Sequence, residues 1–247
     1  MTWLWMMLLA LFGLGAKPDA LSPIAAPTPT IAVQHVPSVT INNEQFTYSY
    51  FIVQLPSDIS LIPNFSRPKD VQTLMTENTC TSAVNGGFYD TAGRPLGYFF
   101  SNTRTYSAKI VSSLVNGFFW ADDSGTALIS TALPDIPYRF ALQTGPMILF
   151  NGQTMMLTIQ NDEYARRMVA GKTTDNQFVF LTVYSSDSVF SGPMLSQLPA
   201  LVADISTKEN LDIADAVNLD GGSASAFYSS DTRLSELTPV GSIFCVK

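Results

Sequence analysis

Short runs of apolar, β-branched and aromatic residues recur along the chain, and each run is closed by Gly, Asn, Asp or Ser. Four runs have the composition of β-strands: 45–55 (QFTYSYFIVQL), 109–120 (KIVSSLVNGFFW), 146–152 (PMILFNG) and 177–185 (QFVFLTVYS). We therefore expect strands to dominate the fold.

Two other segments repeat their apolar residues with the period of an α-helix. In 67–78 the repeat falls on Val71, Leu74 and Met75, and in 192–205 it runs from Met194 to Val202. Pro199 predicts that the second helix is kinked or built in two pieces. Together the patterns predict the α+β class: a single domain dominated by a mixed β-sheet, with a few helices.

The N-terminus differs in composition from the rest of the chain. Residues 1–16 (MTWLWMMLLALFGLGA) form an apolar block that ends in small residues, which is typical of an export signal. No Lys or Arg precedes the block, so an uncleaved anchor or a buried element is the alternative. Residues 17–30 are rich in Pro, Ala and Thr and read as a tether, which leaves 31–247 as the domain. We expect a secreted or cell-envelope protein, with a membrane tether through the N-terminus as one option.

Composition excludes several classes of function. The chain is 46% apolar and 13% charged, as expected for a packed globular protein. Its net charge of −7, with no clustered Lys and Arg in the sequence, argues against a nucleic-acid partner. The single histidine, His35, lies beside the tether, which argues against imidazole catalysis and against a metal site of soft ligands. We expect no cofactor. Cys80 and Cys245 could form a disulfide or remain two buried thiols, and the sequence does not decide between these alternatives.

Four stretches combine polar side chains with glycines, which allow a backbone to approach a ligand closely. They are AVNGGFYD (83–90), ALQTGPMILFNG (141–152), YARRMVAG (164–171) and AVNLDGGSASAFY (216–228). In the last stretch Asn218 and Asp220 are two residues apart, so both side chains point to the same face of an extended strand.

The order of these motifs resembles the phosphodiester glycosidase family. The similar segments are NGGF at 85–88, GPMILFNG at 145–152, RMVAG at 167–171 and NLDGGSAS at 218–225, so the resemblance extends from about Val84 to the C-terminus. Many family members carry Asp-Gly-Arg after the strand that follows the arginine motif, whereas this chain reads VYSSDSVF at 183–190. The substrate contacts of that arginine are therefore not expected here.

The resemblance implies a hydrolase that cleaves the glycosidic bond of a sugar 1-phosphodiester in an exported or envelope glycan. The leaving group of such a bond is already a stable anion, so one carboxylate is sufficient without a strong general acid. We expect Asp220 to act as nucleophile or base and Arg167 to clamp the phosphate with its planar fork of donors. The expected substrate-binding residues are Asn85, Gly86, Gly87, Gln143, Gly145, Asn218, Gly221, Gly222 and Ser223.

Two alternatives remain open. One is a non-catalytic carbohydrate-binding domain of the same fold, suggested by the absent Asp-Gly-Arg. The other is a calcium site in which Asp220 and Asp90 supply oxygen ligands, although no closely spaced Asp-x-Asp-x-Asp loop supports it.

Overall fold

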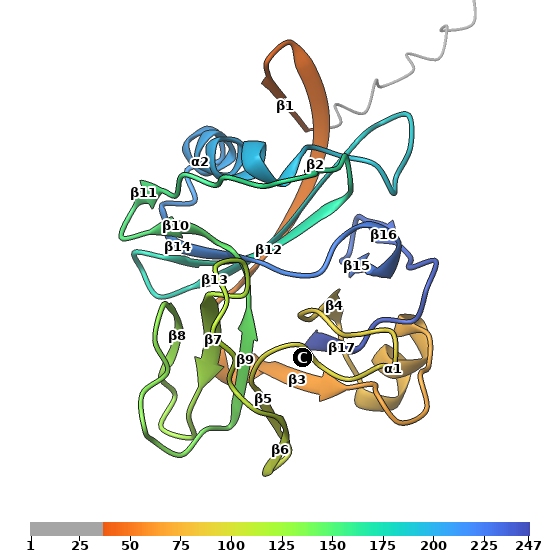
Figure 1. The fold of residues 1–247 in the computed structure, drawn as a ribbon, viewed down its shortest axis with the longest axis vertical. Coiled ribbons are helices and arrows are strands. Elements are labelled where there is room, and N and C mark those ends of the chain that lie inside the picture. The colour runs from red at the N-terminus through yellow and green to blue at the C-terminus, as the bar shows by residue number, and fades with distance from the viewer. Residues whose placement is uncertain (1–36) are drawn as a thin grey trace, which may run out of the picture. The chain divides into compact units, whose positions relative to one another are not determined.

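The computed structural model describes residues 37–247, which form one compact unit (Figure 1). The expectations for the export signal or anchor, the tether, His35 and the start of the domain at residue 31 lie outside the described residues. No helix within 37–247 has the length and apolarity needed to span a bilayer.

A seven-stranded sheet forms the largest layer. Its strand order is β1-β2-β13-β12-β14-β10-β11. The strands are β1 (Ser38–Ile41), β2 (Glu44–Val53), β13 (Phe178–Tyr184), β12 (Arg167–Thr173), β14 (Ile213–Asn218), β10 (Met147–Phe150) and β11 (Gln153–Thr154). Both faces of this first sheet are covered, which explains why six of the seven residues of β13 are buried instead of alternating with exposed ones.

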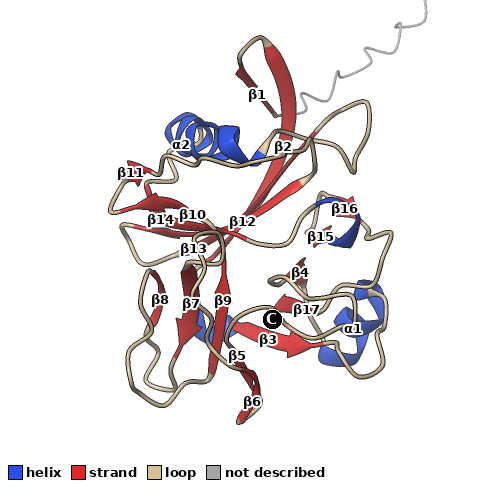
Figure 2. Cartoon of the chain, in the orientation of Figure 1, coloured by secondary structure: helices blue, strands red, loops and turns tan. Residues whose placement is uncertain are grey.

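Two five-stranded sheets complete the fold (Figure 2). The second sheet has the order β16 (Arg233–Leu234), β15 (Phe227–Tyr228), β4 (Ser82–Asn85), β17 (Ser242–Val246) and β3 (Ile59–Pro63). The third has the order β6 (Arg104–Ser107), β5 (Phe99–Ser101), β9 (Phe140–Thr144), β7 (Gly117–Ala121) and β8 (Ala127–Ser130).

The helices among the described residues are short. They are α1 (Val71–Asn78), α2 (Leu198–Lys208) and three single 3₁₀ turns, η1 (Pro56–Asp58), η2 (Leu195–Gln197) and η3 (Gly222–Ala224). The turn η2 leads directly into α2, and Pro199 lies in the first turn of α2, where a missing N–H is tolerated. The predicted two-piece helix is therefore confirmed.

The expected α+β class with a mixed sheet is only partly correct, because the fold is mainly β. The strand pairs of all three sheets are antiparallel. Parallel pairs need long crossover connections, usually helical, whereas several neighbouring strands here are joined by tight turns. One such turn is Asn42-Asn43 between β1 and β2, where both residues have positive φ.

Three of the four predicted strands correspond to β2, β10 and β13. The fourth, expected over 109–120, begins only at Gly117, and 108–116 is a loop. This part of the prediction was wrong because the apolar residues of the loop do not enter the sheet. Ile110, Val111 and Leu114 are instead exposed.

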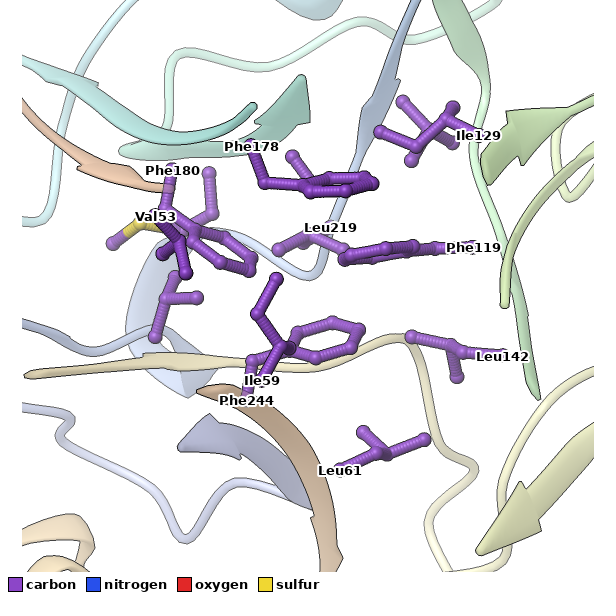
Figure 3. Close-up of a cluster of buried hydrophobic side chains, with 14 of the residues drawn as sticks. Val53, Ile59, Leu61, Phe119, Ile129, Leu142, Phe178, Phe180, Leu219 and Phe244 are labelled. Carbon is purple, nitrogen blue, oxygen red and sulfur yellow. The ribbon is translucent and has the colours of Figure 1, made fainter. Parts of the chain in front are cut away.

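The main core lies where the three sheets meet. Phe119 of β7 packs against Phe178 and Phe180 of the first sheet and Phe244 of the second, with ring centroids 4.9–6.2 Å apart (Figure 3). A second core fills the space between the first sheet and α2, where Leu198, Leu201, Val202 and Ile205 are buried. Each sheet thus buries aromatic or aliphatic side chains against another layer.

A disulfide joins Cys80, just after α1, to Cys245 of β17, with 5.3 Å between the Cα atoms. It decides between the two alternatives left open by the sequence. The bond closes a loop across a sequence separation of 165 residues and packs with the small core between α1 and the second sheet. A cross-link of this span stabilises the fold by restricting the unfolded chain.

We expect reduction of Cys80–Cys245 to weaken the fold by about 2–4 kcal/mol. For a domain of this size the melting temperature should fall by roughly 5–15 °C. Calorimetry with and without a phosphine reductant measures the change. The double variant Cys80→Ala/Cys245→Ala is the control, and the reductant should not affect it. An unchanged melting temperature for the reduced wild type would contradict the stabilising role.

Candidate active site

Asp220 lies two residues beyond the end of β14, and the preceding residue fixes its direction. Leu219 is fully buried in the main core, where it lies near Phe119 and Phe178 (Figure 3). Its N–H donates to the carbonyl of Met168 at 2.8 Å, and the N–H of Asp220 donates to the carbonyl of Gly86 at 3.1 Å. Because side chains alternate along an extended backbone, Asp220 points away from that core.

The buried amide of Asn85 connects Asp220 to two other segments. Its Nδ2 donates to the carbonyl oxygens of Gly86 and Asp220 at 3.0 and 2.9 Å, and its Oδ1 accepts from the N–H of Ala226 at 3.0 Å. All three of these hydrogen bonds join the Asn85 amide to backbone atoms. Asn85 thus positions the site, and its amide is already engaged where sequence reasoning expected it to bind sugar.

Asn218 lies against the Thr144–Gly145 segment at the end of β9. Its Nδ2 donates to the carbonyl of Gly145 at 2.9 Å, and the hydroxyl of Thr144 donates to the carbonyl of Asn218 at 2.9 Å. The Oδ1 atom of Asn218 is buried and has no hydrogen-bond partner among the described residues. It is the one side-chain amide oxygen among Asn85, Gln143 and Asn218 that has no partner.

Gln143 points to the other face of β9. Its Oε1 accepts from the N–H groups of Tyr98 and Ile110, and its Nε2 donates to the carbonyls of Ile110 and Val115. The amide therefore holds the 108–116 loop against the third sheet. The structure brings the backbone of Gln143 near the other motifs but directs its side chain away from them.

Arg167 opens β12, and its stem lies beside the Asp220 loop. A Cβ placed on Gly221 would be 3.9 Å from Cδ of Arg167. The guanidinium donates to the carbonyls of Pro193, at 2.9 Å, and Glu163, and it forms an ion pair with Asp162 at 3.5 Å. The guanidinium that was expected to clamp a phosphate is thus held by the segments before β12 and after β13.

Sequence reasoning passed over the neighbouring Arg166, which is fully buried. Its Nε donates to Oγ of Ser225 at 2.8 Å, its Nη2 donates to the carbonyls of Ser225 and Ser235, and its own carbonyl accepts from the N–H of Gly222. Burial lowers the pKa of Arg166 to about 10. Arg166 holds both ends of the Gly222–Ser225 turn. The pair of adjacent arginines in the sequence could have drawn attention to Arg166. Which way each side chain points could be learned only from the structure.

Gly86 and Gly221, from the motifs at 85–88 and 218–225, allow other parts of the protein to approach closely, and not a ligand. A Cβ on Gly86 would lie 2.1 Å from Oγ of Ser242, and one on Gly221 would lie 2.6 Å from the carbonyl oxygen of Arg166. The backbone contact requires glycine at position 221, whereas a side chain at position 86 would have to displace the hydroxyl of the buried Ser242. Beyond them, Gly222 has a φ of +62° and Ser223 is exposed.

The electrostatics of the site depend on Asp220. Burial raises the pKa of its carboxyl to about 7, and the opposing influence is the N–H of Gly221, which donates to Oδ1 at 2.9 Å. Tyr89 follows the Asn-Gly-Gly-Phe motif, and burial, together with the Asp220 carboxylate, raises its pKa. The ring of Tyr89 lies against Gly241, next to the Ser242 that accepts from Gly86, so Tyr89 lies near the site. The sequence analysis did not select it, although it directly follows a motif that was identified. Its hydroxyl donates to the carbonyl of Pro239.

The calcium alternative has little support from side-chain placement. Within residues 37–247 no three His, Cys, Asp or Glu side chains lie close enough to hold a metal ion. Asp90 is engaged elsewhere, because its carboxylate accepts from the N–H groups of Ala92 and Arg94 and pairs with the Arg94 guanidinium at 2.7 Å.

Comparison with known proteins gives the family. The phosphodiester glycosidase family model matches residues 78–247, and the chain belongs to this family. Membership supports a glycosidase-type function with a carbohydrate-type substrate. No curated protein matches the chain by sequence.

Three solved structures share the fold. The catalytic domain of zebrafish N-acetylglucosamine-1-phosphodiester alpha-N-acetylglucosaminidase has a TM-score of 0.58 at 15% identity, covering 86% of each chain. A hypothetical protein from Synechocystis has a TM-score of 0.62 at 14% identity, covering 85% of this chain and 61% of that one. A putative exported protein from Burkholderia pseudomallei has a TM-score of 0.54 at 11% identity, covering 82% and 74%.

The raised pKa of Asp220 predicts a stability that falls with pH. Below about pH 4 the carboxyl is protonated in both the folded and the unfolded chain. Between pH 4 and 7 the unfolded chain releases the proton while the folded chain retains it, so folding becomes less favourable. Asp220→Asn removes this penalty, and at pH 8 it should melt roughly 3–10 °C above the wild type, with a smaller difference at pH 4.5.

Thermal melts at the two pH values measure this difference. Asp187→Asn, which alters an exposed carboxylate in the loop after β13, should follow the wild type at both values. A difference between Asp220→Asn and the wild type that does not grow with pH would show that Asp220 is not the group responsible.

Proposed function

We propose that this protein is a hydrolase that cleaves the glycosidic bond of a sugar 1-phosphodiester, with Asp220 as its nucleophile or base. The observation that carries the proposal is a carboxyl whose pKa is raised to about 7 at the point where four family motifs meet. A group with a pKa near the operating pH is best suited to proton transfer, and ionised carboxylates can also attack an anomeric carbon.

Two routes are consistent with a single carboxylate. In one, an oxygen of Asp220 attacks C1 of the sugar, the bond from C1 to the phosphate oxygen breaks, and the phosphate leaves with the bonding electrons. Water then hydrolyses the glycosyl ester and restores the carboxylate. In the other route, Asp220 removes a proton from water as that water attacks C1. Both routes yield a free sugar and a phosphate monoester, but the first retains the anomeric configuration and the second inverts it.

The neighbouring groups support these roles. The unpartnered Oδ1 of Asn218 is buried, so it accepts a hydrogen bond from a sugar hydroxyl only if the Asn218 side chain or its cover moves when substrate binds. The stem of Arg167 lies beside Gly221, and its guanidinium contributes donors to a phosphate near Asp220 if it leaves its present partners, the carbonyls of Pro193 and Glu163 and the Asp162 carboxylate. Asn85 and Arg166 hold the loop on which Asp220 and Gly221 lie.

The proposed substrate and location rest on different observations. The zebrafish relative is named for an N-acetylglucosamine 1-phosphodiester, and we propose a substrate of this class in an exported or envelope glycan. The apolar segment 1–16 and the Cys80–Cys245 disulfide both suit an exported, oxidising environment.

A carbohydrate-binding domain without turnover is the second candidate. It is favoured by the 185–190 segment, which lacks the Asp-Gly-Arg of many family members and places Phe190 against the Arg166 guanidinium, 4.7 Å from the ring centroid. The two functions differ in one measurable respect, the release of free sugar.

Asp220→Asn should still bind a sugar 1-phosphodiester but lose turnover by roughly two orders of magnitude or more, because the amide retains the shape and loses the charge. Wild-type turnover should rise as pH increases through about 7, since the ionised carboxylate is the active form. Release of sugar from the methyl ester of N-acetylglucosamine 1-phosphate, with calorimetric binding in parallel, measures both effects. Asp187→Asn is the matched control. Equal turnover in Asp220→Asn and the wild type would remove Asp220 from the mechanism, and binding without release by the wild type would establish the binding-domain function.

Arg167→Lys should weaken the same substrate selectively. Lysine keeps the positive charge but loses the planar fork of donors, so KM should rise roughly tenfold while inhibition by the free sugar changes little. Arg233→Lys, an exposed arginine of β16, is the control and should leave both values unchanged. An equal loss of affinity for the phosphodiester and the free sugar would contradict the phosphate role.

A further inference from the structure

A pocket of about 660 Å³ is lined by Tyr89 and Gly241. Gly241 precedes Ser242, whose carbonyl accepts from the N–H of Gly86 beside Asp220, so the pocket lies near the Asp220 site. Its wall is formed mainly by uncharged groups, including Phe65, Pro68, Tyr89, Pro239 and Val240. The charged lining residue is Asp90, which is already paired with Arg94. We call this pocket the aromatic pocket. A lining of rings with few charges suits the face of a saccharide and not a phosphate.

A second pocket, of about 290 Å³, adjoins the first, since both are lined by Asn64 and Phe65. Three cations line it, namely Arg67, Lys69 and Arg104, together with one carboxylate, Glu77. We call it the basic pocket. The whole chain has only 13 Lys and Arg and a net charge of −7, so this gathering of cations runs against the overall charge of the protein.

The cations of the basic pocket are not all neutralised. Lys69 pairs with Glu77 at 2.6 Å. Within residues 37–247 no carboxylate lies within ion-pair distance of Arg67 or Arg104. The guanidinium of Arg104 lies over the ring of Tyr106, 4.9 Å from its centroid, which leaves its donors available. Two arginines with free donors form a ready site for a phosphate group.

A chain of contacts connects the two pockets with Asp220. The N–H of Asp220 donates to the carbonyl of Gly86 at 3.1 Å, and the N–H of Gly86 donates to the carbonyl of Ser242, next to Gly241, at 2.8 Å. A Cβ on Gly241 would lie 2.7 Å from the ring of Tyr89 and 2.9 Å from that of Phe65, so the two rings lie on either side of this glycine. Phe65 in turn packs against Tyr106, with centroids 5.8 Å apart, and Tyr106 contacts Arg104.

Buried Asn64 fixes the wall between the pockets. Its Nδ2 donates to the carbonyls of Lys69 and Val240 at 2.9 and 2.8 Å, and its Oδ1 accepts from the N–H of Lys69 at 2.9 Å. Its N–H donates to the carbonyl of Gly241 at 2.8 Å. The relation between the two pockets is therefore set by buried hydrogen bonds and not by exposed side chains.

We propose that the substrate is a glycan with more than one phosphodiester, whose saccharide next to the cleaved bond occupies the aromatic pocket and whose following phosphate binds Arg67 and Arg104. This inference rests on the proposed function and extends it from a single sugar 1-phosphodiester to an oligomeric or polymeric sugar phosphate. In such a substrate an uncharged saccharide ring is followed by a phosphate anion. The protein offers an uncharged pocket for the ring and an adjoining basic pocket for the anion.

The test compares two probes in the Asp220→Asn background, where cleavage does not interfere with binding. One probe is the methyl-capped sugar 1-phosphate used for the turnover assay, and the other is its head-to-tail dimer with two phosphodiesters. By calorimetry at 50 mM NaCl, the dimer should bind about tenfold more tightly, a preference that should shrink at 500 mM NaCl because exposed charges are screened.

Arg67→Gln/Arg104→Gln in the same background should reduce the preference to about twofold or less. Arg233→Gln removes one exposed cation elsewhere and should leave the tenfold preference intact. Because Arg67 and Arg104 are exposed, these changes should not unfold the chain, and a melt of each variant, together with the single Arg104→Gln, checks this. Equal affinity for the two probes, a preference that survives the double variant, or no binding of either probe would overturn the proposal.

This outcome is separable from that of the proposed function. If the wild type releases no sugar but the dimer preference and its dependence on the two arginines are found, the hydrolase proposal fails and the extended binding site stands. If sugar is released but the preference is absent, the hydrolase proposal stands and the extended site fails.

Discussion

The buried amide of Asn85 is the interaction on which the site depends. Its three hydrogen bonds reach Gly86 in its own segment, Asp220 after β14 and Ala226 before β15, so one side chain joins the first and second sheets at the candidate active site. An amide with these partners cannot be replaced by an apolar group without leaving buried polar backbone unsatisfied, at a cost of roughly 1–3 kcal/mol for each group. The close approach also explains why glycine follows Asn85 and Asp220.

The contact between the first and second sheets at Asn85 also creates a conflict between stability and reactivity. Bringing the sheets together shields Asp220 from much of the water without burying it completely, and the main compensation is a single hydrogen bond from Gly221. A structural carboxylate would be expected to have a cation or several N–H donors, as Asp162 has in Arg167 and the N–H groups of Leu195 and Ser196. The contrast between Asp162 and Asp220 is what distinguishes a carboxylate that stabilises the fold from one suited to chemistry.

Charged side chains are distributed unevenly around this contact between the sheets. The acidic chain places unpaired arginines beyond Phe65 and keeps the space between them and Asp220 almost free of charge. An alternation of neutral and basic surfaces of this kind favours a ligand whose charges are spaced along its length. The fold thus supplies the position of Asp220, and the two pockets beyond Tyr89 are where we expect substrate specificity to lie.

Much of this protein could be read from local sequence. The apolar runs gave β2, β10 and β13, the helical repeats gave α1 and α2, and the glycine-rich motifs indicated which segments form the site, because these properties depend on neighbours along the chain. What depends on distant partners had to come from the tertiary structure. The loop at 108–116 is held by Gln143, β4 pairs with β17 although the two strands are far apart in sequence, and Cys80 meets Cys245 only when α1 packs on β17. The sequence could therefore single out Asp220, but its raised pKa could not be foreseen, because desolvation is set by the segments that fold over a carboxyl and not by the residues beside it.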